Sequence, residues 1–213
     1  MVTWTSAGST NVGHGLGVAP NLIIMKARNA TENWLVGSDE IDWAKRIKLN
    51  STDGSANSSA FGQAPTSSIF YCSPASSSYN YVAYCFSEVQ GYSKFGSYKG
   101  NGNADGPFIY TGFKPAWVMW KRTDASGNSW GLVDYRRNKN DTSDVGNVID
   151  VYLAPDLDND DSGNGDAVMD FLSNGFKIRR TGNFINVDGS TYVYMAFAES
   201  PFVSSEGVPT TAR

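Results

Sequence analysis

The chain has 213 residues, 40% of them hydrophobic and 13% aromatic, which is enough to bury a core. Only 18% are charged, and Gly, Ser, Asn and Tyr fill the difference, a composition that favours strands joined by turns over helices. The net charge of -4 gives no attraction for phosphate backbones or anionic lipid, and no apolar run reaches the length of a membrane span, so we expect neither a nucleic-acid partner nor membrane insertion.

The first predicted hairpin lies at residues 20–36, PNLIIMKARNATENWLV. A proline opens a short apolar run, a polar segment follows, and a second run contains a tryptophan. Residues 115–133, PAWVMWKRTDASGNSWGLV, repeat this pattern. The aligned pairs are Pro20 with Pro115, Lys26 with Lys121, Ala30 with Ala125, Asn33 with Asn128 and, after two insertions, Trp34 with Trp130 and Val36 with Val133.

A second motif recurs in the same order, as YVAYCFSE at residues 81–88 and YVYMAFAE at residues 192–199. The matching residues are Tyr81, Val82, Phe86 and Glu88 with Tyr192, Val193, Phe197 and Glu199. Two motifs in one order predict an internal repeat, with halves of about 1–94 and 95–203 and a polar C-terminal tail.

Turn residues predict the remaining strands of the second half. The dipeptides at 174–175 (Asn-Gly) and 188–189 (Asp-Gly) favour tight hairpin turns. In FKIRR, Phe176 and Ile178 alternate with basic residues, as in a half-buried strand. The last strand, at 191–199, is apolar on both faces, which is typical of a strand in the centre of a sheet.

Two similar sets of strands pack best as facing sheets that each bury one face. We therefore predict an all-β chain, a β-sandwich whose halves are related by a pseudo-two-fold axis. We expect one domain over residues 1–213, because no linker of useful length separates the halves. A closed barrel is the main alternative.

The two cysteines, Cys72 and Cys85, flank a stretch that is able to turn. A disulfide across a hairpin is one interpretation, and two reduced core residues are the other. The N-terminal residues lack the basic start and apolar run of a secretory signal, which favours the reduced form.

These motifs resemble a family of modules near the C-termini of structural proteins of tailed phages, especially marine ones. The resemblance rests on GHGLGVAPNLIIMK, YVAYCFSEVQGYSKFGSYKGNG, GPFIYTGFKPAWVMWKR, FLSNGFKIR and YVYMAFAESPFVSSEGVPTTAR, and it covers most of the chain. It implies a tail-fibre or other virion surface protein, made in the host cytoplasm, with a concanavalin-like or jelly-roll-like fold. Phage fibres are commonly trimers, so the resemblance also implies a homo-oligomer. It carries over no catalytic residue.

Catalytic chemistry finds little support in the sequence. The single histidine, His14, lies between glycines without an adjacent acid or a nucleophile turn, so a structural role is expected. Glu88 and Glu199 hold equivalent repeat positions, as the paired carboxylates of a glycosidase with a pseudo-symmetric cleft would, but duplication alone explains the match. We expect that the chain is not an enzyme.

The acidic stretch at 156–166, DLDNDDSGNGD, contains a candidate calcium site. Asp156, Asp158 and Asp160 have the spacing that wraps oxygen ligands around Ca²⁺. The match to an EF-hand is poor, since Asp161 stands at the glycine position and Ala167 at the final glutamate position. A solvated acidic loop is the alternative, and no other cofactor is expected.

Aromatic residues in polar surroundings are candidates for ligand binding. Trp43 in IDWAKR and Tyr135 in VDYRRNKND each follow the second strand of a repeat. Flat aromatic faces stack on sugar rings, and the adjacent Arg136 and Arg137 are able to satisfy hydroxyl groups. Packing at a sheet edge is the alternative for both rings.

The sequence thus predicts a virion adhesion or structural module. Its partners would be host-surface carbohydrate or other virion proteins, contacted through loops on a rigid sandwich. The alternatives are a capsid-decoration or fibre-assembly protein without a ligand, and a polysaccharide-degrading enzyme.

Overall fold

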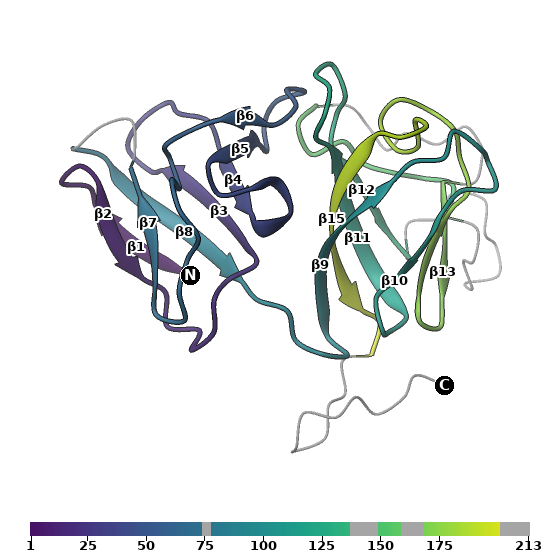
Figure 1. The fold of residues 1–213 in the computed structure, drawn as a ribbon, viewed down its shortest axis with the longest axis horizontal. Helices are drawn as coiled ribbons and strands as arrows, with labels where there is room; N and C mark the ends of the chain where they lie inside the picture. Colours follow the sequence, from purple (N-terminus) through teal and green to yellow (C-terminus); the bar gives the residue numbers. More distant parts are fainter. Residues whose placement is uncertain (74–77, 137–148, 159–167, 201–213) are drawn as a thin grey trace. The chain divides into compact units, whose positions relative to one another are not determined.

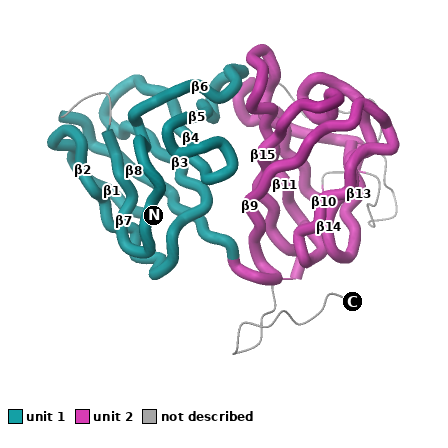
Figure 2. The backbone as a smooth tube through the Cα atoms, viewed as in Figure 1, with its two compact units in different colours: residues 1–88 teal, residues 89–213 magenta. Residues whose placement is uncertain are grey.

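The computed structural model describes residues 1–73, 78–136, 149–158 and 168–200. Its sheets are antiparallel, and the described residues contain one short 3-10 helix and no α-helix, so the predicted all-β fold is confirmed (Figure 1). The chain divides into two compact units, Met1–Glu88 and Val89–Arg213 (Figure 2). No helix in these described ranges is long and apolar enough to cross a membrane.

The first unit contains a six-stranded sheet in the order β1-β8-β3-β4-β5-β6 and a two-stranded sheet, β2-β7. Its elements are β1 (Val2–Thr5), β2 (Thr10–Gly13), β3 (Leu22–Ala27), β4 (Leu35–Ser38), η1 (Asp39–Ile41), β5 (Lys45–Lys48), β6 (Ala56–Asn57), β7 (Ile69–Cys72) and β8 (Asn80–Phe86). Buried residues of both sheets, among them Met25 on β3 and Phe70 on β7, form one hydrophobic cluster. The unit is therefore a two-layered β-sandwich.

The second unit contains a four-stranded sheet, β12-β11-β15-β9, and a three-stranded sheet, β10-β14-β13. Its strands are β9 (Ser93–Lys99), β10 (Phe108–Tyr110), β11 (Pro115–Arg122), β12 (Gly131–Asp134), β13 (Met169–Leu172), β14 (Gly175–Ile178) and β15 (Thr191–Ala198). Trp120 and Tyr192 from the first sheet and Phe176 from the second share a core cluster. This unit is a second β-sandwich.

The two units share one strand order. The order β1-β8-β3-β4 in the first corresponds to β9-β15-β11-β12 in the second, and the pair β2-β7 corresponds to β10-β14. The register corresponds too, since Lys26 pairs with Val82 and Lys121 pairs with Val193. This correspondence is what a duplication of one sandwich predicts.

The strand pairing changes one detail of the repeat alignment. Ile24 lies opposite Val36 in the first unit, and Met119 lies opposite Leu132 in the second. Val36 therefore corresponds to Leu132 and not to Val133, so only one residue needs to be inserted, in the loop before the tryptophan.

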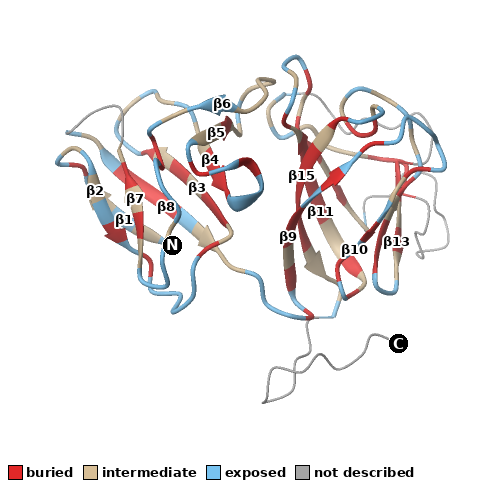
Figure 3. Cartoon of the chain, in the orientation of Figure 1, coloured by how far each residue is buried: buried red, intermediate tan, exposed pale blue. Residues whose placement is uncertain are grey.

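We predicted one hydrophobic core, but the described residues form two. Every buried residue of one hydrophobic cluster lies in the first unit, and every buried residue of the other lies in the second. In Figure 3 the buried positions run along β3, β8, β11 and β15, the inner strands of the two larger sheets. Each half has two sheets of its own, so it buries an apolar face without needing strands from the other half.

The hairpin signals located most strands of the second unit. β13 and β14 form the predicted hairpin, although the strand ladder places Gly175 in β14 and moves the two-residue turn to 173–174. β15 lies between β11 and β9, which confirms the prediction of a central strand. The dipeptide at 188–189 also forms a turn, with Gly189 at φ 72°, but residues 183–187 before it are not a strand.

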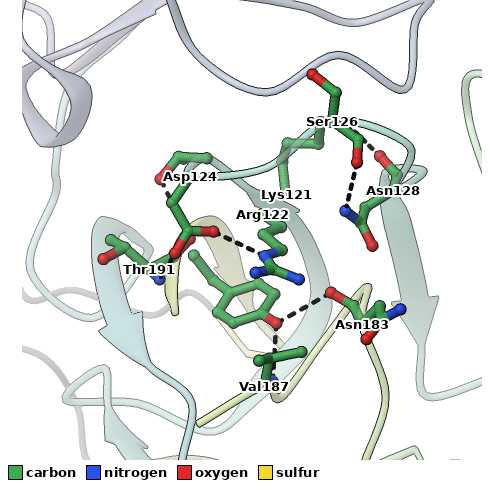
Figure 4. A network of polar contacts seen from close by, with 10 residues as sticks. Lys121, Arg122, Asp124, Ser126, Asn128, Asn183, Val187 and Thr191 are labelled. Carbon is green, nitrogen blue, oxygen red and sulfur yellow. Dashed lines mark hydrogen bonds and ion pairs between the residues drawn. The ribbon is translucent and has the colours of Figure 1, made fainter. Parts of the chain in front are cut away.

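Polar contacts fix the loop between β11 and β12 (Figure 4). Arg122 Nε donates to Asp124 Oδ1 at 2.7 Å, and Asp124 Oδ2 accepts from the Thr191 N–H at 3.3 Å. Burial raises the pKa of Asp124, but hydrogen bonds from Arg122 and Thr191 outweigh it and hold that pKa below its usual value. The ammonium group of the fully buried Lys121 donates to the Asn128 carbonyl. The polar loop is thus tied to the start of β15.

Candidate binding surface

The structure places Trp43 in the core of the first unit, so the predicted ligand role for this ring is wrong. Trp43 is only 7% exposed, and its ring packs edge-on against Phe61 with centroids 5.9 Å apart. The polar neighbours of Trp43 suggested a surface loop. Asp42, whose φ of 70° turns the backbone after η1, lies just before the tryptophan that enters the core.

Tyr135 and Arg136 lie together directly after β12. Tyr135 packs partly against the core of the second unit, and the guanidinium carbon of Arg136 lies 4.8 Å from the centre of its ring. Contacts within the chain therefore occupy much of the ring surface that we assigned to a ligand. Arg137 lies outside the described residues.

Two of the three predicted calcium ligands are described. Asp156 Oδ1 accepts a hydrogen bond from the Trp130 N–H at 3.0 Å, and Asp158 is exposed. Asp160 lies outside the described residues. Among the residues that are described, no three His, Cys, Asp or Glu side chains gather as metal ligands would, so the calcium site gains no support from the structure.

His14 and the repeated glutamates have structural contacts. His14 is 6% exposed, its Nε2 lies 3.0 Å from the Thr66 carbonyl oxygen, and its Nδ1 accepts from the Leu16 N–H. Glu199 forms an ion pair with Lys114 at 2.7 Å, and the backbone N–H of Glu88 donates to Asn21 Oδ1 at 2.8 Å. The structural role expected for His14 matches its contacts.

An exposed aromatic pair lies on the second unit, at positions that the sequence analysis did not single out. Phe108 is 46% exposed and Tyr110 is 64% exposed, while Ile109 between them is buried. On a strand, residues two apart share a face, so both rings lie on the outer side of the sheet β10-β14-β13. We call this surface the aromatic face, and it comprises Phe108, Tyr110, Asp170, Leu172, Gly175, Lys177 and Arg179, together with Asp105 from the preceding loop.

The strand register arranges the aromatic face in two rows. Tyr110 lies opposite Gly175, which lies opposite Leu172 on the third strand. In the next row Phe108 lies opposite Lys177, which lies opposite Asp170. One row is therefore apolar with a glycine at its centre, and the other joins an aromatic ring to two charged side chains.

Gly175 makes room for the Phe108 ring. A Cβ atom at position 175 would lie 2.9 Å from Phe108 Cζ and 2.1 Å from the Ile109 carbonyl oxygen. Any side chain there would displace the ring or the strand, because both distances are shorter than real Cβ contacts. Covering a glycine with a neighbouring ring also stabilises a sheet, but it leaves much of both rings exposed to solvent.

Two ion pairs border the rings. Lys177 Nζ lies 2.7 Å from Asp105 Oδ1, and Arg179 Nε lies 3.3 Å from Asp170 Oδ2. The hydrogen bond and the positive charge of Lys177 hold the pKa of Asp105 below its usual value, so this carboxyl group is ionised at neutral pH. The face therefore presents two cations and two anions beside its aromatic pair.

The loop that carries Asp105 is held by a buried amide. Asn186 is fully buried, and its Nδ2 donates to Asn101 Oδ1 at 3.1 Å and to the Asn103 carbonyl at 2.7 Å. Asn103 Oδ1 in turn accepts from the Asp105 N–H at 2.9 Å. These bonds fix the backbone on both sides of Asn103, so the Asp105 carboxylate is attached to a preformed loop.

The first unit does not repeat the aromatic face. The buried pair Ile109 and Phe176 corresponds to Val12 and Phe70, because both pairs are directly opposed in equivalent strands. By this register the positions of Phe108 and Tyr110 correspond to Asn11 and Gly13 on β2. The buried positions kept their apolar character and the exposed ones did not, so the fold itself does not require aromatic side chains there.

A groove of about 470 Å³ lies along β1 and β2 in the first unit. Its lining is mostly Thr, Val, Ala and Gly, with Asn11 and Trp4. The Trp4 ring contributes to the core, since it stacks on Tyr81 at 5.5 Å and packs edge-on against Phe70 at 5.7 Å. The aromatic face is the stronger candidate, because its rings are more exposed and charged groups lie beside them.

Comparison with known proteins places the chain in one family. No curated protein and no solved structure matches it. Residues 1–201, which include both units up to the end of β15, match a family described as Domain of unknown function (DUF7483). The chain belongs to this DUF7483 family.

Proposed function

We propose that this chain is a non-enzymatic binding module of a virus particle, an adhesin that attaches through the aromatic face of its second unit. The observation that carries the proposal is the exposure of Phe108 and Tyr110 on a rigid sheet. Exposed aromatic rings are typical of binding surfaces. The assignment to a phage tail fibre or other virion surface protein is supported by the sequence resemblance.

The partner in this proposal is host-surface carbohydrate or another virion protein. Binding sites for either kind of partner use aromatic rings flanked by polar groups, since the rings supply contact area and the charged side chains fix the orientation of the partner. The three strands of the sheet pair continuously in register, so little conformational entropy is lost on binding.

Binding of the purified chain to host cells tests the proposal. Replacing Phe108 or Tyr110 by alanine should lower the affinity for the cells about tenfold, because each change removes about 1.4 kcal/mol of ring contact. Tyr92→Ala is the matched control, since Tyr92 is 42% exposed, is aromatic and lies off the face. Equal loss in the control, or no loss in either face variant, would refute the proposal.

A fibre-assembly role is the second candidate, and the same face favours it because apolar rings also seal interfaces between copies. Sedimentation of the unmodified chain and of Phe108→Ala separates the two roles. An oligomer that dissociates in Phe108→Ala would assign the face to assembly. An unchanged state together with lost cell binding would assign it to adhesion.

A further inference from the structure

We propose that the ligand of the aromatic face is an uncharged saccharide. This inference rests on the proposed adhesive function and adds the chemical class of the ligand. Phe108 and Tyr110 are two residues apart on β10, so their Cα atoms are about 6.6 Å apart along the strand. Neighbouring flat apolar rings on one side of a strand offer successive stacking positions to an extended chain of sugar rings.

The charges of the face balance, which fits an uncharged ligand. Lys177 pairs with Asp105 and Arg179 pairs with Asp170, so no net charge remains beside the rings. A sulfated or uronic-acid glycan would have to compete with both carboxylates, and the side chain of Asp105 is 78% exposed. The chain as a whole also carries a net charge of -4, which repels polyanions.

The same ion pairs supply partners for hydroxyl groups. The exposed Asp105 carboxylate accepts hydrogen bonds, and the Arg179 guanidinium, whose side chain is 42% exposed, has N–H donors beyond the one that faces Asp170. Carboxylates and guanidinium groups together match the mixed donors and acceptors of a sugar ring. Apolar peptide ligands would leave these charged groups desolvated without replacement partners.

Titration with matched oligosaccharides tests the inference. The probes are neutral oligomers of glucose, galactose, mannose and N-acetylglucosamine, each beside its sulfated form, and a uronic-acid oligomer. At least one neutral oligomer should bind, and its affinity should change less than about twofold between low and high salt, since no net charge is involved. Phe108→Ala and Tyr110→Ala should weaken it about tenfold, and Tyr92→Ala should not.

Asp105→Asn provides a charge control that keeps a hydrogen-bond acceptor. It leaves Lys177 without its carboxylate partner and so makes the face positive. The ratio of the affinity for the sulfated oligomer to the affinity for the neutral one should rise several-fold in this variant at low salt, because the added net positive charge favours only the sulfated form.

The outcomes separate this inference from the proposed function. Binding of only the acidic oligomers, or of no oligomer while cell binding still depends on Phe108, overturns the uncharged saccharide and leaves the adhesin in place. If cell binding is also unchanged in Phe108→Ala and Tyr110→Ala, the proposed function itself is refuted.

Discussion

The two thiols of the first unit differ in burial. Cys72 is fully buried on β7, where its thiol lies 3.4 Å from Met25 Sδ, and Cys85 on β8 is half-buried. Both are free, so the reduced form favoured by the sequence is the one present. β7 and β8 belong to different sheets, so they do not pair as the hairpin across which a disulfide was considered.

Burial raises the pKa of Cys72 to about 12 and that of Cys85 to about 11. A raised pKa favours the folded state below the pKa of the unfolded thiol, about 8.5, and that contribution is lost as pH rises towards 11 to 12. At pH 8 the folded chain should resist iodoacetamide at both thiols for hours, because few thiolates form. Mass spectrometry of Cys72→Ser and Cys85→Ser should show Cys85 reacting before Cys72, and rapid labelling of Cys72 without unfolding would contradict this.

The exposure of individual aromatic residues was not predictable from the sequence. The sequence suggested Trp43 because its neighbours are polar, yet the ring packs on Phe61. Phe108 and Tyr110 were not predicted as binding residues, although in FIY an aromatic residue on each side of a buried isoleucine carried the signal. Exposure depends on which sheet face is covered, and local composition does not determine this.

Among elements, the hairpins were the most predictable. The strand β11 and its partner β12 were found from a proline, an apolar run and a returning tryptophan, because these signals are local. The strand β13 (Met169–Leu172), by contrast, was indicated only by the predicted turn between it and β14. A four-residue strand lacks a distinctive period, so its pairing partner decides its conformation.

The apolar run of each repeat ends in a lysine, Lys26 in the first and Lys121 in the second, and each lysine stabilises the end of its strand to a different extent. Lys121 is fully buried and its ammonium donates to the Asn128 carbonyl, whereas the half-buried Lys26 donates to the carbonyls of Ala27 and Ala30. Lys121→Met should cost about 1–3 kcal/mol of unfolding free energy, because it leaves a buried acceptor without this donor. Lys26→Met should cost less, since water reaches its site.

Urea unfolding of the two variants and the unmodified chain measures this difference. The midpoint should fall further for Lys121→Met than for Lys26→Met, with similar slopes. A stabilised Lys121→Met would show instead that the cost of burying the ammonium exceeds the value of its hydrogen bonds.

At the scale of the whole molecule, the repeat located the two halves, but we predicted one sandwich and the structure has one in each half. The corresponding halves followed from motifs that recur in order, and the central place of β15 followed from its two apolar faces. The two cores did not, because the alternation of apolar residues says that a face is buried and not which sheet covers it. Phe70 and Phe176 each pack within their own unit, and nothing in either local sequence distinguishes that from a common interior.

Hydrogen exchange followed along the whole chain tests the two cores. Phe61 is 1% exposed in the first core and Phe176 is fully buried in the second, so alanine at either position removes about 3–5 kcal/mol of packing. Phe61→Ala should reduce amide protection first in β3 and β8, and Phe176→Ala first in β11 and β15, because those strands contribute buried residues to the same core cluster as the replaced ring. Equal loss of protection in all four strands for both variants would show one cooperative core, since a cavity in either unit would then weaken both.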